Sequence, residues 1–199
     1  MDREYWNDSF KQDPTSVHVE DHILEAELKN LHPGTALDLG CGAGYNALML
    51  AEAGWSVTGV DWSEHAVKLA NKRAEKLGLL AKFIVGDITN WQPAEYFDLV
   101  ISTYALPGGQ DSLKALDTAL SALKTGATLI LAEWDVSMAQ AWGFEESELT
   151  SLNQIVHHLT EVEIEAAEIR RLDCIFADDD PRAFAGTSAN IVFVRARKV

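Results

Sequence analysis

The chain has 199 residues, 47% of them hydrophobic, which favours a single domain with a substantial core. Its formal net charge of −15 disfavours nucleic acid as a substrate, because a duplex-binding surface needs cations to neutralise phosphates. No apolar run approaches the roughly 20 residues that a membrane span needs. The charged start, from Met1 to Glu4, predicts no secretory signal, so we expect a cytoplasmic protein.

The first 32 residues are expected to form an arm before the first strand. Tyr5, Trp6 and Phe10 stand among polar residues, and residues 17–31 have the leucine spacing of an amphipathic helix. An arm in this position is free to fold over the ligand-binding edge as a lid. The alternative is that its aromatic residues only pin it to the core, and both interpretations stay open.

A short apolar segment, 35–39, is followed at once by Gly40, Gly42 and Gly44. Three alternating glycines let the backbone turn sharply and approach a ligand with no side chain in the way. Residues 46–53 are apolar nearly all round, so they predict a buried helix. The pattern therefore indicates a buried strand, a ligand-binding loop and a helix in immediate succession.

A second strand is expected over residues 55–60, and Asp61 stands at its end. The order of strand, glycine loop, helix, strand and acid is typical of the nucleotide-binding half of a doubly wound α/β sheet. An acid about 20 residues past the glycines is well placed to accept hydrogen bonds from both ribose hydroxyls.

The glycine spacing distinguishes between two kinds of ligand. A dinucleotide fingerprint, G-x-G-x-x-G, faces a pyrophosphate, but here Tyr45 stands where that pattern needs glycine. Asp38, directly before the loop, would repel a pyrophosphate and favour a cation. S-adenosylmethionine, with its ribose, adenine and amino-acid tail, therefore fits better than a nicotinamide dinucleotide, and an oxidoreductase is disfavoured.

The segment Asp38-Leu39-Gly40-Cys41-Gly42-Ala43-Gly44, with Asp61, resembles the first two motifs of class I S-adenosylmethionine-dependent methyltransferases. The resemblance runs from about residue 35 to 132, and more weakly to the end. Tyr5-Trp6 and Tyr45-Asn46-Ala47-Leu48 are similar to the small single-domain members of the tellurite-resistance and thiopurine methyltransferase group. This resemblance implies that Asn46 belongs to the cofactor site and that Tyr5 and Trp6 contact the substrate.

Residues 64–77 predict a helix capped by Ser63, and 81–85 predict a third strand. The resemblance implies that Trp62 stacks on the adenine face. It also implies that Asp87 accepts a hydrogen bond from the adenine amino group and that Ile88 packs near the ring. A surface tryptophan and a turn aspartate are the alternatives.

A fourth strand, 97–102, leads into the loop 102–109, which should face the transferred methyl group. Ser102 and Tyr104 are predicted to line the cofactor site, although Tyr104 is equally an ordinary loop residue. The loop lacks the Asn/Asp-Pro-Pro-aromatic signature of enzymes that methylate amino groups of nucleic-acid bases. Its low polar content also leaves open a non-catalytic binding module.

The second half of the chain predicts fewer site residues. Glu133 follows a fifth strand and is expected to form a salt bridge rather than reach the site. Trp142 lies in residues 136–146, a region that often roofs the substrate pocket in the family, so Trp142 is a candidate substrate contact. A contact with the core is the equal alternative. The remaining expected elements are a helix at 111–123 closed by 124–126, a strand at 127–132, a helix at 146–159, and strands at 160–174 and 189–195.

Neither histidines nor cysteines predict a metal site. The pairs His18 and His22, and His157 and His158, lack a third ligand at suitable spacing. Cys41 and Cys174 form no metal or disulfide pattern. We therefore expect no metal.

The expected fold is a doubly wound, Rossmann-like α/β domain over residues 1–199, with a helical arm or lid at 1–32 and a core at 33–199. Its seven-stranded, mostly parallel sheet carries helices on both faces and ends in an antiparallel edge hairpin. The expected function is methyl transfer from S-adenosylmethionine to a small-molecule acceptor, in a monomer or homodimer. The alternative is a module that binds S-adenosylmethionine or S-adenosylhomocysteine without catalysis. The sequence assigns neither a catalytic base nor the acceptor.

Overall fold

The computed structural model describes residues 3–12, 23–143, 145–173 and 188–199. Within these residues, seven strands form one sheet in the order β3-β2-β1-β4-β5-β7-β6. The strands are β1 (Thr35–Leu39), β2 (Ser56–Asp61), β3 (Ala81–Val85), β4 (Phe97–Thr103), β5 (Leu123–Trp134), β6 (Val162–Asp173) and β7 (Ser188–Lys198). Strands β1 to β5 pair in parallel, whereas β7 is antiparallel to both β5 and β6. The predicted sheet and its antiparallel edge hairpin are confirmed.

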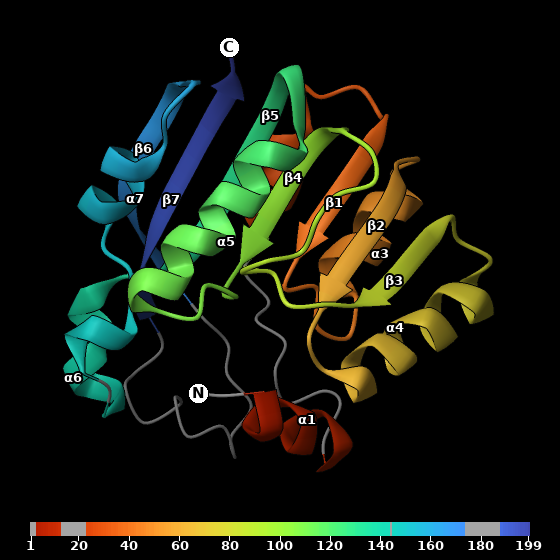
Figure 1. Ribbon diagram of the computed structural model, residues 1–199, viewed down its shortest axis with the longest axis horizontal. Helices are drawn as coiled ribbons and strands as arrows, with labels where there is room; N and C mark the ends of the chain where they lie inside the picture. Colours follow the sequence, from red (N-terminus) through yellow and green to blue (C-terminus); the bar gives the residue numbers. More distant parts are fainter. Residues whose placement is uncertain (1–2, 13–22, 144, 174–187) are drawn as a thin grey trace.

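Helices cover both faces of this sheet (Figure 1). The α-helices are α1 (Arg3–Gln12), α2 (Ile23–Leu28), α3 (Tyr45–Glu52), α4 (Glu64–Leu77), α5 (Gly109–Ala122), α6 (Ala139–Trp142) and α7 (Leu152–His158), with short 3-10 turns η1 (Val136–Met138) and η2 (Glu146–Glu148). No helix in the described segments is long and apolar enough to cross a membrane.

The two helical layers follow from the alternation of side chains along each strand. In β1, Ala36 packs in the cluster that holds α2, α3 and α4, and Leu37 packs in the opposite cluster with α5 and α7. In β7, Phe193 and Val194 divide in the same way. Both faces are therefore buried, as near-continuous apolar strands of a parallel sheet require.

Helix α4 begins and ends as predicted, because its caps are local in sequence. The Ser63 hydroxyl accepts a hydrogen bond from the amide of Ala66 at 3.2 Å. Gly78 ends the helix in the left-handed region, with φ of 65°. Of the predicted helix at 17–31, the described part is helical over Ile23–Leu28. Helix α1, whose bounds the sequence did not give, holds the aromatic residues of the expected helical arm.

Two predicted boundaries in the second half are wrong. Residues 124–126 do not close a helix, because β5 already begins at Leu123, which pairs with Phe97 of β4. The predicted helix at 146–159 is interrupted, and α7 begins only at Leu152. The reason is a second cap: Ser151 and Gln154 form a reciprocal capping box that starts a new helix.

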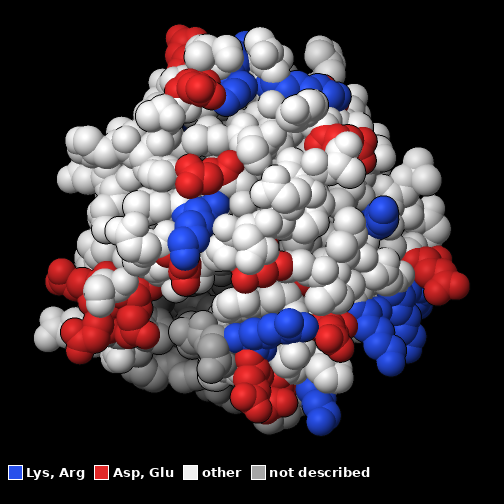
Figure 2. Space-filling view, in the orientation of Figure 1, with Lys and Arg blue, Asp and Glu red and all other residues white. Residues whose placement is uncertain are grey.

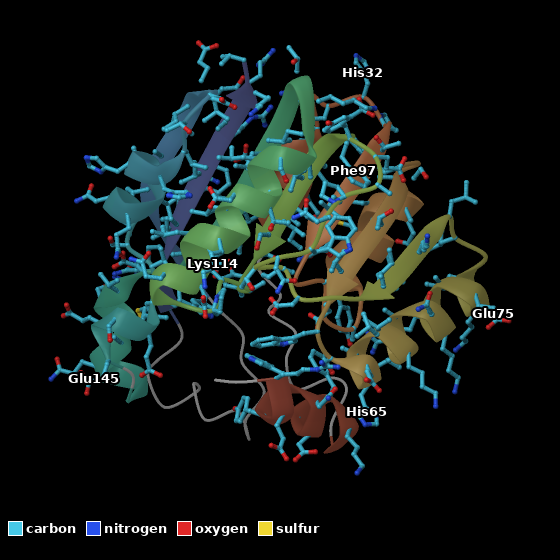
Figure 3. All side chains as sticks on the ribbon, viewed as in Figure 1. His32, His65, Glu75, Phe97, Lys114 and Glu145 are labelled. Atoms are coloured by element: carbon cyan, nitrogen blue, oxygen red, sulfur yellow. The ribbon has the colours of Figure 1, made fainter. Side chains whose placement is uncertain are left out.

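The carboxyl ends of the parallel strands lie at one edge of the sheet, and α1 lies across this edge (Figure 1). In Figure 3, His65 at the start of α4 and Lys114 on α5 mark this edge, whereas His32 lies at the opposite one. Ligands of open α/β sheets bind outside the carboxyl ends of the strands. The sequence-predicted residues from Asp38 to Tyr104 gather here.

Candidate active site

The glycine loop between β1 and α3 is held in a conformation that favours glycine. Gly40, Gly42 and Gly44 have φ angles of 77°, 48° and 84°. The amide of Gly40 donates to the carbonyl of Val60 at 2.8 Å, which ties the loop to β2. A Cβ atom added to Gly40 would lie 2.1 Å from the Cβ of Ala105, so the loop after β4 already fills that space.

Asp61, at the end of β2, joins the glycine loop to the start of α4. One carboxylate oxygen accepts a hydrogen bond from the amide of Gly42 at 2.9 Å, and the other accepts from the amide of Ser63 at 2.8 Å. The side chain is 7% exposed, and burial raises the pKa of this carboxyl although both amides oppose the shift. Each oxygen keeps a second lone pair, so the group retains the capacity to accept ribose hydroxyls.

Asp38, at the end of β1, is buried with one carboxylate oxygen that has no hydrogen-bond partner among the described residues. Burial and the charge of Asp61 raise its pKa to about 7, while the amide of Ala47 lowers it. The hydroxyl of Ser102 is likewise buried and without a partner in the described part of the chain. Buried polar atoms normally have partners, so both atoms are suited to a bound polar or cationic ligand.

The start of α3 and the end of β4 meet beside these acids. The Asn46 side-chain amide donates to the hydroxyl of Thr103 at 2.8 Å. Tyr104 follows with φ of 55°, an unusual value for a bulky residue, and its ring stacks on Trp134 at 4.3 Å between centroids. The predicted residues Asn46, Ser102 and Tyr104 therefore converge on the glycine loop, while their contacts with a cofactor stay predictions.

The predicted adenine side lies at the ends of β2 and β3. Trp62 is half-buried, and Ile88 is buried in the cluster that packs under α5. One carboxylate oxygen of Asp87 accepts from the amide and the hydroxyl of Thr89, at 2.9 and 2.7 Å. Asp87 thus takes part in a turn, and its adenine contact stays a prediction.

The described part of the N-terminal arm packs against the glycine loop and the start of α4, and its role as a lid stays a prediction. Phe10 is buried over the glycine loop, where a Cβ on Gly42 would lie 3.1 Å from its ring, and Trp6 packs in the same small cluster. The hydroxyl of Ser63 donates to the side chain of Asn7 at 2.8 Å. The sequence did not identify Phe10 or Asn7 as site residues, because their contacts come from the docking of α1.

Of the predicted substrate contacts Tyr5 and Trp142, the structure describes the side chain of Tyr5 only. Tyr5 is 51% exposed and packs edge-on against Trp6, with ring centroids 5.4 Å apart. The side chain of Trp142 lies outside the described part of the structure. Their roles in substrate binding therefore stay predictions.

The salt bridge predicted for Glu133 is wrong, because no Lys or Arg in the described segments pairs with it. The side chain is 5% exposed, and one oxygen accepts hydrogen bonds from the amides of Ala105 and Leu106, at 3.0 and 3.2 Å. Burial raises the pKa of this carboxyl to about 8, against the opposing effect of the two amides. An acid directly after a buried strand was the available sequence signal, but its partners lie in another loop.

His157 and His158 form hydrogen bonds within the protein, and Cys41 is buried. The ring of His157 contacts the carbonyl of Asn153 at 2.7 Å, and the ring of His158 contacts Asp117 at 2.8 Å. Cys41 is buried, and burial raises the pKa of its thiol. Over the described ranges, no group of three or more His, Cys, Asp or Glu side chains is arranged to hold a metal ion. Cys174, His18 and His22 lie outside those ranges.

A family model described as a methyltransferase domain matches residues 32–177. Two curated relatives are a probable S-adenosyl-L-methionine-dependent methyltransferase, TehB, from Haemophilus influenzae and the 2-methyl-6-phytyl-1,4-hydroquinone methyltransferase of Synechocystis. TehB is 34% identical over 95 residues, which cover 48% of this chain and 32% of TehB. The second relative is 36% identical over 111 residues, which cover 54% of this chain and 35% of the relative. The matched segments thus span about a third of the length of each relative.

Solved structures show the same fold over nearly the whole chain. The crystal structure of Haemophilus influenzae TehB has a TM-score of 0.73 at 20% identity, with 98% of this chain and 67% of TehB covered. The N-methyltransferase NodS from Bradyrhizobium japonicum, in complex with S-adenosylhomocysteine, has a TM-score of 0.66 at 20% identity, with 88% and 83% covered. The family model covers well over half of the chain and contains the glycine loop and Asp61. The protein therefore belongs to the methyltransferase-domain family.

Proposed function

We propose that this protein is an S-adenosylmethionine-dependent methyltransferase that acts on a small-molecule acceptor. The observation that carries the proposal is Asp61, a buried carboxylate held by the amides of Gly42 and Ser63 at the mouth of the glycine loop. The family membership and the names of the relatives support the same cofactor.

The residues of the site fit the proposed cofactor. Asp61 is suited to its ribose hydroxyls, and the unpartnered oxygen of Asp38 is suited to its ammonium group or to a water that bridges to it. Trp62, Asp87 and Ile88 lie at the strand ends where the adenine is expected. When bound, the cofactor supplies a methyl group that a positively charged sulfur already activates.

The chain's own contribution is to orient and enclose the reactants. Holding two reactants in line at short distance lowers the activation barrier by roughly 7–11 kcal/mol. The glycine loop, the loop after β4 and α1 provide the walls that hold them and exclude water. We assign no general base, because an acceptor that arrives deprotonated needs none.

The charge of the protein supports a small molecule rather than nucleic acid as the acceptor. Acidic and basic side chains are mixed over the face seen in Figure 2, with basic ones gathered mainly over α4 and along the top. The net charge of −15 opposes the phosphate contacts that duplex binding requires. A small-molecule acceptor and a cytoplasmic location stay predictions.

A calorimetric titration with S-adenosylmethionine, S-adenosylhomocysteine and NAD tests the proposal. We expect the two adenosyl ligands to bind and NAD not to bind. The substitution Asp61→Asn replaces one acceptor oxygen by a donor, so it should weaken adenosyl binding roughly 10- to 100-fold, which corresponds to one charged hydrogen bond. Unchanged affinity would refute the role of Asp61.

Asp135→Asn is a matched control. Asp135 also follows a strand, is buried, and accepts from the amide of the serine two residues on, Ser137, at 3.0 Å. It differs from Asp61 in making no bond to the glycine loop, so its substitution should leave the cofactor affinity unchanged. Adenosyl binding without methyl release on a broad acceptor panel would instead favour the non-catalytic module, and NAD binding alone would favour an oxidoreductase.

A further inference from the structure

Glu133, the second-to-last residue of β5, is a buried acid to which the proposed methyl transfer assigns no role. It is 5% exposed and has no basic partner among the described residues. Burying an acid without such a partner is costly, and most core positions avoid it. The bonds that one oxygen of Glu133 accepts from Ala105 and Leu106 are therefore the feature that needs an explanation.

The end of β5 holds three consecutive backbone amides of the loop after β4. The amide of Tyr104 donates to the carbonyl of Ala132 at 2.8 Å. The next two amides donate to the carboxyl group of Glu133, at 3.0 and 3.2 Å. Tyr104 has φ of 55°, a conformation that a tyrosine adopts only where its surroundings impose it. Two adjacent residues of β5 thus impose the path of this loop.

The same loop forms one wall of the space between the glycine loop and the end of β4, which we call the cofactor cradle. The Cβ of Ala105 occupies the space directly against Gly40, 2.1 Å from where a side chain on that glycine would begin. The side-chain amide of Asn46, at the start of α3, donates to the hydroxyl of Thr103, which directly precedes this loop, at 2.8 Å. A shift of Ala105 would therefore change the width of the cradle between the glycine loop and the end of β4.

We propose that Glu133 is a positioning residue of the methyl-transfer site, which fixes the wall of the cofactor cradle by holding the amides of Ala105 and Leu106. The inference rests on the proposed cofactor site. Glu133 acts through the loop and needs no contact with the cofactor or the reacting atoms. Misplacement of a wall by about 1 Å is sufficient to reduce transfer strongly.

Two substitutions separate the acceptor role from the acid itself. In Glu133→Gln, the side-chain carbonyl oxygen still accepts both amide hydrogen bonds, whereas Glu133→Ala leaves both amides without an acceptor. Glu133→Gln is expected to fold as the wild type does, whereas Glu133→Ala loses two buried hydrogen bonds and therefore some stability, which its melting temperature measures. We expect hydrogen exchange at Ala105 and Leu106 to stay at the wild-type rate in the Gln variant and to rise at least tenfold in the Ala variant.

The affinity for S-adenosylmethionine, measured by calorimetry, should follow the exchange rates. We expect the Gln variant to bind within threefold of the wild type and the Ala variant to bind at least tenfold more weakly. Leu129→Ala is the control: Leu129 is fully buried in the same strand, so its loss should lower the melting temperature without changing the exchange at residues 105 and 106. Ile130→Val is a milder control for the same comparison.

Each other outcome overturns the proposal in a distinct way. Wild-type exchange and affinity in Glu133→Ala would show that the loop does not depend on Glu133. A Gln variant as weak as the Ala variant would assign the effect to the acid rather than to positioning. Weak binding by the Leu129 control would assign it to lost stability. If the wild type bound no adenosyl ligand, the proposed function would fail, while the exchange rates would still decide whether Glu133 holds the loop.

Discussion

At the amino ends of the strands, the carboxylate of Asp98 has a basic partner within the chain. It accepts hydrogen bonds from the amide of Thr35 at 2.9 Å and from the ammonium of Lys124 at 2.8 Å, and these partners lower its pKa to about 2. At the carboxyl ends, Asp38 and Glu133 are buried without a basic partner among the described residues, and burial raises their pKa values to about 7 and about 8.

The edge hairpin follows the pattern of the amino ends. Glu165 of β6 pairs with Arg195 and Arg197 of β7, and these arginines lower the pKa of its carboxyl. Glu27 of α2 pairs with Arg170 and Arg195 in the same network. The acids of the amino ends and the hairpin thus have basic partners, whereas Asp38 and Glu133 at the carboxyl ends have none in the described part of the chain, and one oxygen of Asp38 has no hydrogen-bond partner there.

The largest effect is expected from Gly40→Ala, with Gly126→Ala as its matched control. Both glycines have positive φ angles, 77° and 81°, so the backbone strain of an alanine is similar. An added Cβ at Gly40 meets Ala105, whereas nothing lies within 4 Å at Gly126. We expect Gly40→Ala to weaken S-adenosylmethionine binding by roughly 100-fold or more, and Gly126→Ala to cost about 1 kcal/mol of stability without changing affinity.

Calorimetry and urea unfolding measure the two parts of this prediction. Equal losses of affinity in both glycine variants would mean that the carboxyl edge is no more sensitive than the amino edge. The difference between the two edges would then lie in their charges alone.

A smaller effect is expected from Asp38→Asn, measured by urea unfolding without ligand at pH 5 and pH 8. The pKa of Asp38 is raised from 3.8 to about 7, so the folded protein keeps this proton over that range while the unfolded chain releases it. Stability should therefore fall as the pH rises from about 4 to about 7, by on the order of a few kcal/mol. The Asn variant should lack this part of the fall.

Glu133 contributes to the wild-type pH dependence in the same direction, so the role of Asp38 is read from the difference between the two proteins. We expect Asp38→Asn to be the more stable protein at pH 8 and to bind S-adenosylmethionine roughly tenfold more weakly. Identical pH profiles would show that Asp38 is not held in its protonated form.

The smallest effect is expected from Asp98→Asn at the amino edge. Its lowered pKa means that its contribution to stability is present above pH 3.8 and is lost as the pH falls through about 2. The side chain is 42% exposed, so solvent screening limits the loss at pH 7 to under about 1 kcal/mol. The affinity for S-adenosylmethionine should not change, and a tenfold loss would contradict the contrast between the two edges.

Local patterns in the sequence determined the parallel half of the fold and the centre of the site. The three glycines and the cap at Ser63 depend on residues a few positions apart, and Asp61 follows Gly42 by 19 residues within one strand-loop-helix-strand unit, so spacing and residue type were sufficient to predict them. The break between η2 and α7 was also encoded locally, by the capping box of Ser151 and Gln154, but the apolar periodicity around it masked the signal.

Only the tertiary structure decided which groups meet at the carboxyl edge. Strand β4 lies between β1 and β5, and this order brings Ala105 against Gly40 and places Glu133 under the same loop. Glu133 lies 28 residues along the chain from Ala105. No periodicity links residues so far apart, so the sequence predicted a salt bridge where the fold provides two amides. Chemistry and local spacing therefore determined the residues of the site, and the strand order determined their partners.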